Sequence, residues 1–131
     1  MSDVTVVKWT DVPNGAAGWG LTDAQMEMRI GRTALGCKEH GVSFAKFGKG
    51  FVPTFGHTQK QQEEVYVIIS GTALMNIDGQ VSEVGPGTAV RVGAGVWRAF
   101  RAKDEDVTMI ITGAPLVDDD GVIDMEWWPA S

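Results

Sequence analysis

The residues best suited to chemistry lie in one stretch, Pro53 to Gly71, which reads PTFGHTQKQQEEVYVIISG. Side chains alternate along a strand, so the imidazole of His57 and the amide of Gln59 face the same way if that segment is extended. The carboxylate of Glu64 and the phenol of Tyr66 likewise share one face of the strand that follows. Together these groups predict a polar cluster inside an otherwise apolar β sequence. An imidazole beside a carboxylate can act as a general acid or base near neutral pH.

Short strands separated by turn residues must position this cluster. Seventeen glycines and five prolines are spread along the 131 residues, and Asp78-Gly79 is a strong signal for a two-residue hairpin turn. Strand-like runs recur every eight to twelve residues, which predicts an all-β, antiparallel sandwich or barrel. The expected strands are Val4 to Trp9, Val42 to Phe47, Glu63 to Ser70, Thr72 to Ile77, Gln80 to Val84, Ala89 to Val92, Val96 to Arg101 and Val107 to Thr112. We expect an acidic loop over Asp118 to Gly121 and a tail over Ile123 to Pro129.

The segment from Leu21 to Arg32 fits two interpretations. Asp23 could cap a helix. However, Met26, Met28 and Ile30 alternate with more polar or smaller residues, which is the period of a strand. We therefore expect a strand from about Met26.

Composition restricts the function classes. The length and the 44% apolar content predict one domain, residues 1–131, with a real core. The net charge of −6 disfavours a nucleic-acid partner, because such proteins normally present a basic face. A single cysteine, Cys37, and a start that lacks a signal-peptide pattern predict a cytoplasmic protein. The longest apolar run is too short to span a membrane, so no membrane partner is expected.

The motifs resemble those of the cupin family, whose members are small jelly-roll β-barrels. The family's first motif has two histidines one residue apart, then a glutamate and a glycine, and these positions hold His57, Gln59, Glu64 and Gly71. In the second motif, Gly87 and Gly95 match, Gly93 replaces the usual proline and Arg98 replaces the usual histidine. The resemblance covers about residues 42–112, the expected core barrel, and is closest to small single-domain cupins of undefined activity. It implies an all-β cupin jelly-roll barrel.

The resemblance also implies a degenerate metal site. Metal-binding cupins hold a divalent ion with three histidines and a glutamate, whereas this chain has two histidines in all, His40 and His57. Gln59 offers a carbonyl oxygen, a poor ligand for transition metals, and Arg98 stays protonated and cannot ligate. We therefore expect no metal and no other cofactor. A divalent metal held by His57, Gln59 and Glu64 is the alternative.

Each candidate residue has a functional and a structural interpretation. Glu64 and Arg98 could form an ion pair that presents guanidinium donors to an anionic ligand, or a pair that only satisfies buried charges. His57 could transfer protons or only form hydrogen bonds. Tyr66 could contact a ligand or belong to the core. Met75 and Phe100 are expected as pocket wall or core.

Three functions follow from this pocket. The first is a metal-independent site that binds a polar or anionic metabolite and catalyses proton transfer, as in an isomerase, lyase or cyclase. In that case His57 and Glu64 are catalytic, and Gln59, Tyr66, Arg98, Met75 and Phe100 bind the ligand. The second is a metal-dependent, dioxygenase-like enzyme, and the third is a non-enzymatic binding module.

A homodimer is also expected. Trp9, Trp127 and Trp128 would otherwise expose large apolar area, which monomers avoid. We expect the Trp127-Trp128 pair to cover a sheet edge or to join a dimer contact.

Overall fold

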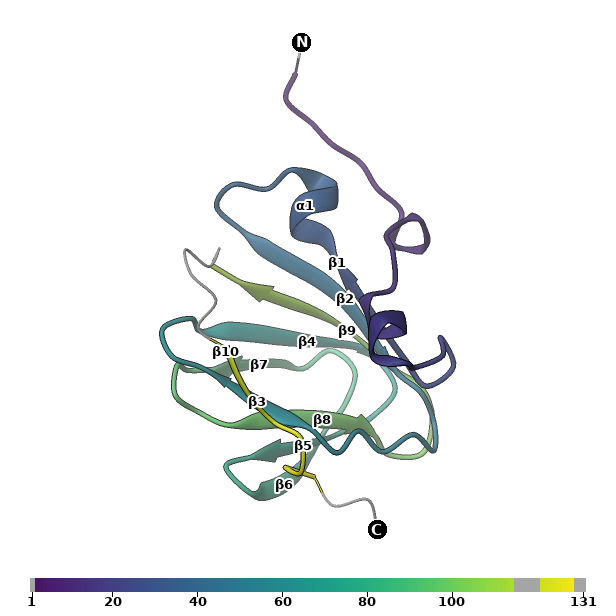
Figure 1. Ribbon diagram of the computed structural model, residues 1–131, viewed down its shortest axis with the longest axis vertical. Helices are drawn as coiled ribbons and strands as arrows, with labels where there is room; N and C mark the ends of the chain where they lie inside the picture. The colour runs from purple at the N-terminus through teal and green to yellow at the C-terminus, as the bar shows by residue number, and fades with distance from the viewer. Residues whose placement is uncertain (1, 115–120, 129–131) are drawn as a thin grey trace.

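The protein folds into two antiparallel five-stranded sheets that face each other, as seen in a computed structural model that describes residues 2–114 and 121–128 (Figure 1). One sheet has the strand order β1-β2-β9-β4-β7 and the other the order β10-β3-β8-β5-β6. The strands of the first sheet are β1 Met26–Ile30, β2 Gly41–Phe47, β9 Val107–Gly113, β4 Glu64–Ser70 and β7 Ala89–Val92. Those of the second are β10 Gly121–Asp124, β3 Gly56–Gln59, β8 Arg98–Ala102, β5 Ala73–Ile77 and β6 Gln80–Val84. This arrangement confirms the predicted all-β jelly roll.

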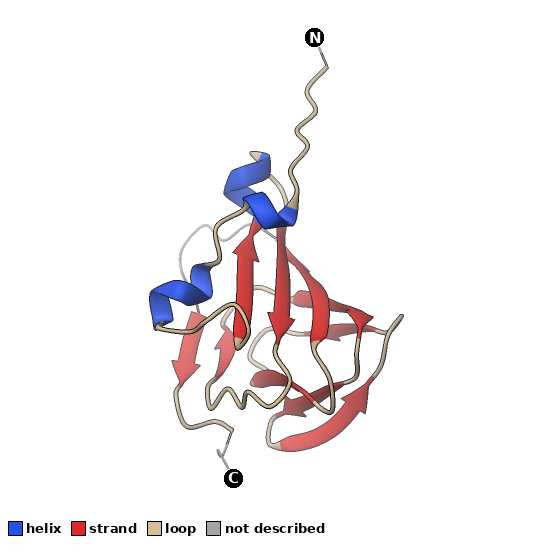
Figure 2. Ribbon diagram, turned by 90° about the vertical axis from the view of Figure 1, so that its right-hand side faces the viewer, coloured by secondary structure: helices blue, strands red, loops and turns tan. Residues whose placement is uncertain are grey.

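Short helices lie outside the sheets. They are the 3-10 helices η1 Trp9–Asp11 and η2 Gly15–Trp19 and the α-helix α1 Gly31–Leu35. Figure 2 shows them on one side of the strands. Within the described residues, no helix has the length and apolar character needed to cross a membrane.

Two turns show why particular residues are needed. Asp78 and Gly79 have φ values of 48° and 91°, the left-handed conformation that a tight hairpin turn requires. The Asn76 side chain accepts a hydrogen bond from the Gly79 amide at 2.9 Å, which fixes this turn between β5 and β6. Gly71 has a φ of 75°, and a Cβ atom there would lie 2.2 Å from the carbonyl oxygen of Asp106. Both the backbone conformation and the close contact therefore require glycine at position 71.

The core lies between the sheets and follows strand alternation. Tyr66 and Ile68 on β4 and Val107 and Met109 on β9 are buried, at 0–2% exposure. Met26, at the start of β1, is 1% exposed. Because β4 and β9 are neighbours in one sheet, their inward residues form a continuous apolar floor. This apolar layer determines which face of β4 points into the barrel interior.

The N-terminal segment corrects one prediction. The run Val4 to Trp9 was expected to form a strand, but residues 2–8 belong to no strand or helix, and η1 begins at Trp9. Val4 and Val6 are 73% and 86% exposed, and the segment reaches away from the barrel (Figure 2). β propensity alone does not make a strand, because a strand also needs a neighbouring edge to pair with.

Smaller differences concern strand ends. The strand from Val96 to Arg101 was expected to begin earlier than β8 does. Val96 and Trp97 instead belong to no strand. They follow the turn at Ala94 and Gly95, in which the Gly95 amide donates to the carbonyl of Gln59 at 2.7 Å. The predicted acidic loop lies outside the described residues except for Gly121, which begins β10. Pro129 also lies outside them.

The C-terminal tryptophans are covered within the chain. The Trp127 and Trp97 rings stack with centroids 5.3 Å apart. Trp128 is 4% exposed, and its amide donates to the carbonyl of Thr54 at 2.7 Å. Trp9 stacks on Phe44. These contacts weaken the argument that these tryptophans need a dimer contact for burial.

Candidate functional site

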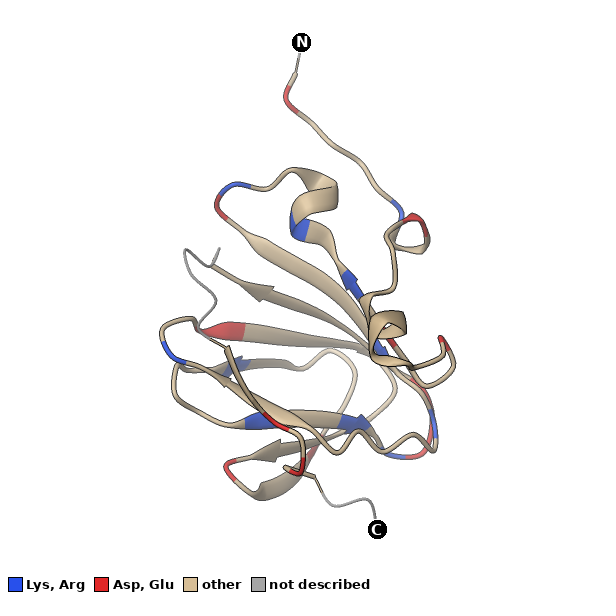
Figure 3. Cartoon of the chain, in the orientation of Figure 1, with Lys and Arg blue, Asp and Glu red and all other residues tan. Residues whose placement is uncertain are grey.

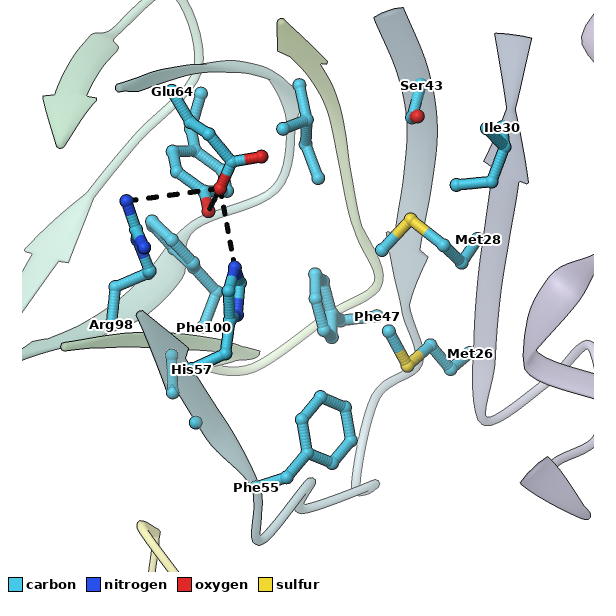
Figure 4. A pocket seen from close by; sticks show the side chains of 14 residues that line it. Met26, Met28, Ile30, Ser43, Phe47, Phe55, His57, Glu64, Arg98 and Phe100 are labelled. Atoms are coloured by element: carbon cyan, nitrogen blue, oxygen red, sulfur yellow. Dashed lines mark hydrogen bonds and ion pairs between the residues drawn. The ribbon is translucent and has the colours of Figure 1, made fainter. Parts of the chain in front are cut away.

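A cavity of about 250 Å³ lies between the two sheets. Its polar groups gather at one end, where His57, Glu64, Tyr66 and Arg98 meet. Figure 4 shows Glu64, His57 and Arg98 pointing toward one another, while methionine and aromatic side chains occupy the other side. The sequence therefore brings four of its predicted site residues to one point.

Strand pairing explains why these side chains converge. His57 on β3 and Arg98 on β8 are directly opposite each other in the second sheet, so their side chains lie on the same, inward face. Glu64 and Tyr66 are two residues apart on β4 of the first sheet, and both line the cavity. The polar cluster therefore joins the two sheets across the barrel.

Glu64 lies closest to the other three polar residues of the cluster. Its Oε1 atom accepts a hydrogen bond from the Tyr66 hydroxyl at 2.7 Å and lies 3.3 Å from His57 Nε2. The nearest guanidinium nitrogen of Arg98 is 4.0 Å from the same oxygen, which is the outer limit of an ion pair. When His57 carries its proton on Nε2, that nitrogen donates to Glu64 and leaves Nδ1 as an acceptor.

These contacts determine the charge state of the carboxyl group. Burial alone would raise the pKa of Glu64, but the hydrogen bonds from His57 and Tyr66 and the nearby charge of Arg98 together hold the pKa below its usual range. Burial, reinforced by the negative charge of Glu64, raises the pKa of the Tyr66 hydroxyl well above its ordinary value. At neutral pH the cluster thus contains a carboxylate and a neutral phenol that donates to it.

Arg98 is the most unusual residue of the site. Its side chain is 0% exposed, and Nε and both terminal nitrogens lack a hydrogen-bond partner among the described residues. A guanidinium group cannot lose its charge in a protein, and a buried charge without hydrogen bonds is costly. Arg98 lines the cavity, so a ligand acceptor brought against its guanidinium group would satisfy donors that have no partner among the described residues.

The remaining walls of the cavity are apolar and were not predicted as site residues. They come from β1, β2, β9 and the segment before β3, and comprise Met26, Met28, Ile30, Phe47, Ile111 and Phe55. Three of these residues, Met26, Met28 and Ile30, could have been found from the sequence, because their alternation predicted the strand β1. That alternation did not reveal that the strand faces the cavity.

Gln59, Met75 and Phe100 differ in their placement. Phe100 lines the cavity, with its ring centroid 4.5 Å from that of Tyr66. Gln59 instead lines a neighbouring cavity of about 210 Å³, where Glu64 forms part of the shared wall. Met75 lies opposite Phe100 on β5 and packs against the core, and it is not among the residues that line either cavity.

The donor set does not fit the metal that the cupin fold commonly holds. His57 and Glu64 are hydrogen-bonded to each other, Gln59 belongs to the adjacent cavity, and the Arg98 guanidinium lies beside the carboxylate. Within residues 2–114 and 121–128, no three His, Cys, Asp or Glu side chains are grouped as metal ligands. One imidazole and one carboxylate beside a fixed cation are a poor site for a divalent ion.

Charged residues elsewhere are mixed in sign. Figure 3 shows acidic and basic residues scattered over strands and loops in this view rather than gathered by sign. Ion pairs such as Glu27 with Lys46, at 2.9 Å, join neighbouring strands. Burial would raise the pKa of Glu27, but hydrogen bonds from Lys46 and Arg29 outweigh it and lower the pKa. The Glu27–Lys46 pair lies outside the cavity and is a cross-strand contact between β1 and β2.

Solved structures with the same fold are numerous but distant in sequence. A cupin protein from Bacteroides fragilis is 21% identical, with 95% of this chain and 99% of that chain covered and a TM-score of 0.68. A sugar phosphate isomerase of the cupin superfamily from Silicibacter pomeroyi is 17% identical, with 81% and 68% covered and a TM-score of 0.62. A variant of the Streptomyces protein PAC13, solved with uridine, is 11% identical, with 89% and 88% covered and a TM-score of 0.65.

Comparison with sequences identifies the family. No curated protein gives a significant match to this sequence. The family model described as the cupin domain matches residues 47–113, which is more than half of the chain and includes β3, β4, β8 and the whole polar cluster. Together with the jelly-roll fold of the two sheets, this match shows that the chain belongs to the cupin family.

Proposed function

We propose that this cupin is a metal-independent small-molecule enzyme that binds an anionic metabolite and transfers a proton. The observation that carries the proposal is the Arg98 guanidinium, which is completely buried, lines the cavity and has no hydrogen-bond acceptor among the described residues. A ligand carboxylate or enolate oxygen would supply that acceptor, as a charge-assisted and often two-pronged contact. Arg98 thus takes the place that a metal has in other members of the family.

The residues beside Arg98 suit proton transfer. His57 is oriented by its contact with Glu64, and its side chain is 32% exposed, so a ligand in the cavity can reach the imidazole. With Nε2–H donated to Glu64, Nδ1 can accept a proton from a ligand carbon or hydroxyl group. Electrons left on the ligand would collect on an oxygen held by Arg98, which stabilises that negative charge.

This step is shared by several reactions. Removal of a proton next to a carbonyl or carboxylate begins many isomerisations, eliminations and cyclisations, so the site supports this chemistry without selecting one of them. The sugar phosphate isomerase and the uridine-bound protein with the same fold agree with a small-molecule ligand. Their low sequence identity transfers the fold and not the substrate.

Hydrogen–deuterium exchange provides a direct test. The protein is incubated in D2O with pyruvate, 4-methyl-2-oxopentanoate and phenylpyruvate, and exchange of the hydrogens next to the carbonyl group is followed by proton NMR. We expect protein-dependent exchange that survives EDTA and is lost in His57→Gln. His40→Gln is the matched control, because it makes the same substitution at an exposed histidine that does not line the cavity.

The alternatives predict other outcomes. Exchange that EDTA abolishes and an added divalent metal restores would support a metal-dependent enzyme. Saturable binding of these acids without exchange in any of them would support a binding module that does not catalyse proton transfer. Both results would overturn the proposed function.

A further inference from the structure

We infer that the ligand is a small apolar monoanion, a single carboxylate attached to an aromatic or branched aliphatic group. This inference rests on the proposed function, because it takes Arg98 as the anion-binding group and asks what the rest of the cavity accepts. Three features of the cavity support it: the charge at its polar end, the composition of its walls and its size.

The polar end provides for one negative charge. Arg98 is the only arginine or lysine among the described residues that line the main cavity, and Glu64 already places a carboxylate 4.0 Å from it. A dianionic phosphate would bring two further negative charges next to Glu64 in a poorly hydrated site, where repulsion between like charges is strong. A monoanion can use the free guanidinium donors with much less repulsion.

The other walls accept apolar groups. Figure 4 shows Met26, Met28, Ile30 and Phe47 on the side opposite Arg98, and Ile111 completes this surface. Ser43 is the one side chain with a hydroxyl group there among the described lining residues. The hydroxyl groups of a sugar would lose their hydrogen bonds to water and regain few, so a polyol is disfavoured. A phenyl or branched alkyl group would be favoured by burial against these side chains.

The size of the cavity limits the ligand. A water molecule occupies about 30 Å³ of liquid, so the volume of about 250 Å³ corresponds to roughly eight waters or a ligand of about ten non-hydrogen atoms. Phenylacetate has this size, and it combines one carboxylate with one aromatic ring.

Phe55 limits how far the apolar group can extend. Its side chain lines the main cavity and also an apolar groove of about 360 Å³ on the other side. Trp19 contacts Phe55 edge to face, with ring centroids 6.1 Å apart, and lines the groove together with Phe51 and Ile123. Phe55 is therefore the partition between the two spaces, and a smaller residue there would join them.

Binding of a matched set of probes tests the inference. Phenylacetate, its neutral analogue phenylacetamide, acetate, gluconate and glucose 6-phosphate are titrated into the intact chain, and affinities are measured by calorimetry. We expect phenylacetate to bind at least about tenfold more tightly than each of the others, the size of effect that one well-filled apolar pocket provides. In Met28→Gln the preference for phenylacetate over acetate should fall, and Ile111→Thr serves as a second wall variant if Met28→Gln melts early.

Two variants test the limit that Phe55 sets on the length of the ligand. Wild type should bind phenylacetate more tightly than 6-phenylhexanoate. In Phe55→Ala the ratio of the two affinities should change by about tenfold in favour of 6-phenylhexanoate. Phe51→Ala is the matched control, because Phe51 lines the groove but not the main cavity.

The outcomes separate the inference from the function on which it rests. Gluconate or glucose 6-phosphate binding as tightly as phenylacetate would overturn the apolar ligand and leave anion binding by Arg98 intact. Equal binding of phenylacetamide and phenylacetate would overturn the role of Arg98. If no acid binds at millimolar concentration, the proposed function and the inference both fail.

Discussion

Replacing Arg98 with methionine should make the empty protein more stable while removing its ability to bind anions. The guanidinium is 0% exposed, and its three nitrogens have no hydrogen-bond partner within residues 2–114 and 121–128. An unsatisfied buried polar group costs about 1–3 kcal/mol. Methionine fills similar space without that cost. Removing one partner of a close buried ion pair is destabilising, but Arg98 and Glu64 lie at the 4.0 Å limit of such a pair. Glu64 is not left alone, because it keeps its contacts with Tyr66 and His57. We therefore expect Arg98→Met to gain about 1–3 kcal/mol in the free energy of unfolding.

Thermal and urea unfolding measure this effect. For a domain of this size, 1 kcal/mol shifts the melting temperature by roughly 3–5 °C, so a rise of about 3–15 °C is expected in the absence of ligand. Arg101→Met is the matched control. It makes the same substitution on the same strand, where Arg101 lies over the Trp128 ring at 4.7 Å and not in the cavity. Because Arg101 has one buried nitrogen without a partner among the described residues, Nε, and loses its ring contact, this variant should gain less stability than Arg98→Met and keep anion binding. A loss of more than about 1 kcal/mol in Arg98→Met, with unchanged slope in urea, would show that Arg98 holds the fold together and refute the reasoning.

Four further predictions follow. The pKa of Glu64 is lowered from the usual 4.5, so the stability that ionised Glu64 contributes is complete above pH 4.5 and is lost as pH falls through its lower pKa in the folded protein. The urea midpoint of Glu64→Gln should therefore depend less on pH than that of wild type between about pH 5 and pH 3. Tyr66 is the single tyrosine of the chain and its pKa is raised, so absorbance at 295 nm should show no tyrosinate until well above pH 10 or until alkaline unfolding. Elemental analysis after dialysis should find far less than one equivalent of transition metal, and EDTA should leave the melting temperature unchanged, whereas a stoichiometric metal would contradict the arginine-for-metal proposal. Light scattering at tens of micromolar tests the homodimer expected from the sequence: the mass of two chains would support it, and the mass of one chain, which the tryptophan contacts within the chain favour, would contradict it.

The positions of most strands along the chain were predictable from local signals. The Asp78-Gly79 turn defines the β5–β6 hairpin, and the alternation that begins at Met26 was correctly interpreted as strand rather than helix. The strand predicted from Val4 to Trp9 was wrong. Its residue types favour a strand, but a strand also needs a neighbouring strand to pair with, and the local sequence does not show whether one is present. The start of β8 was misplaced for a similar reason, since Val96 and Trp97 have strand-like residue types but lie outside β8, whose pairing with β5 begins at Arg98.

The candidate site was predictable where family motifs mark it and not elsewhere. His57, Glu64 and Arg98 occupy motif positions, so their convergence followed from the resemblance, and Tyr66 followed from strand alternation with Glu64. Gln59 also occupies a motif position, but it lines the adjacent cavity, so the predicted contact with the ligand in the main cavity stays a prediction without a supporting contact. The apolar wall could not be found in the same way, because Met28 and Phe47 resemble core residues until the position of the cavity is known.

The strand that carries His57 has a weak backbone connection to its own sheet. β3 pairs with β8 at the single position His57–Arg98, whereas it pairs with β10 at four positions. Few ladder hydrogen bonds therefore oppose a local opening of β3 from β8, and such openings need far less free energy than global unfolding. The same movement would separate His57 from Arg98 and widen the polar end of the cavity. A ligand that contacts both residues would restrain this opening, so the amides of β3 and β10 should exchange with solvent more slowly when the cavity is filled, and the rate of opening would limit how fast a ligand enters.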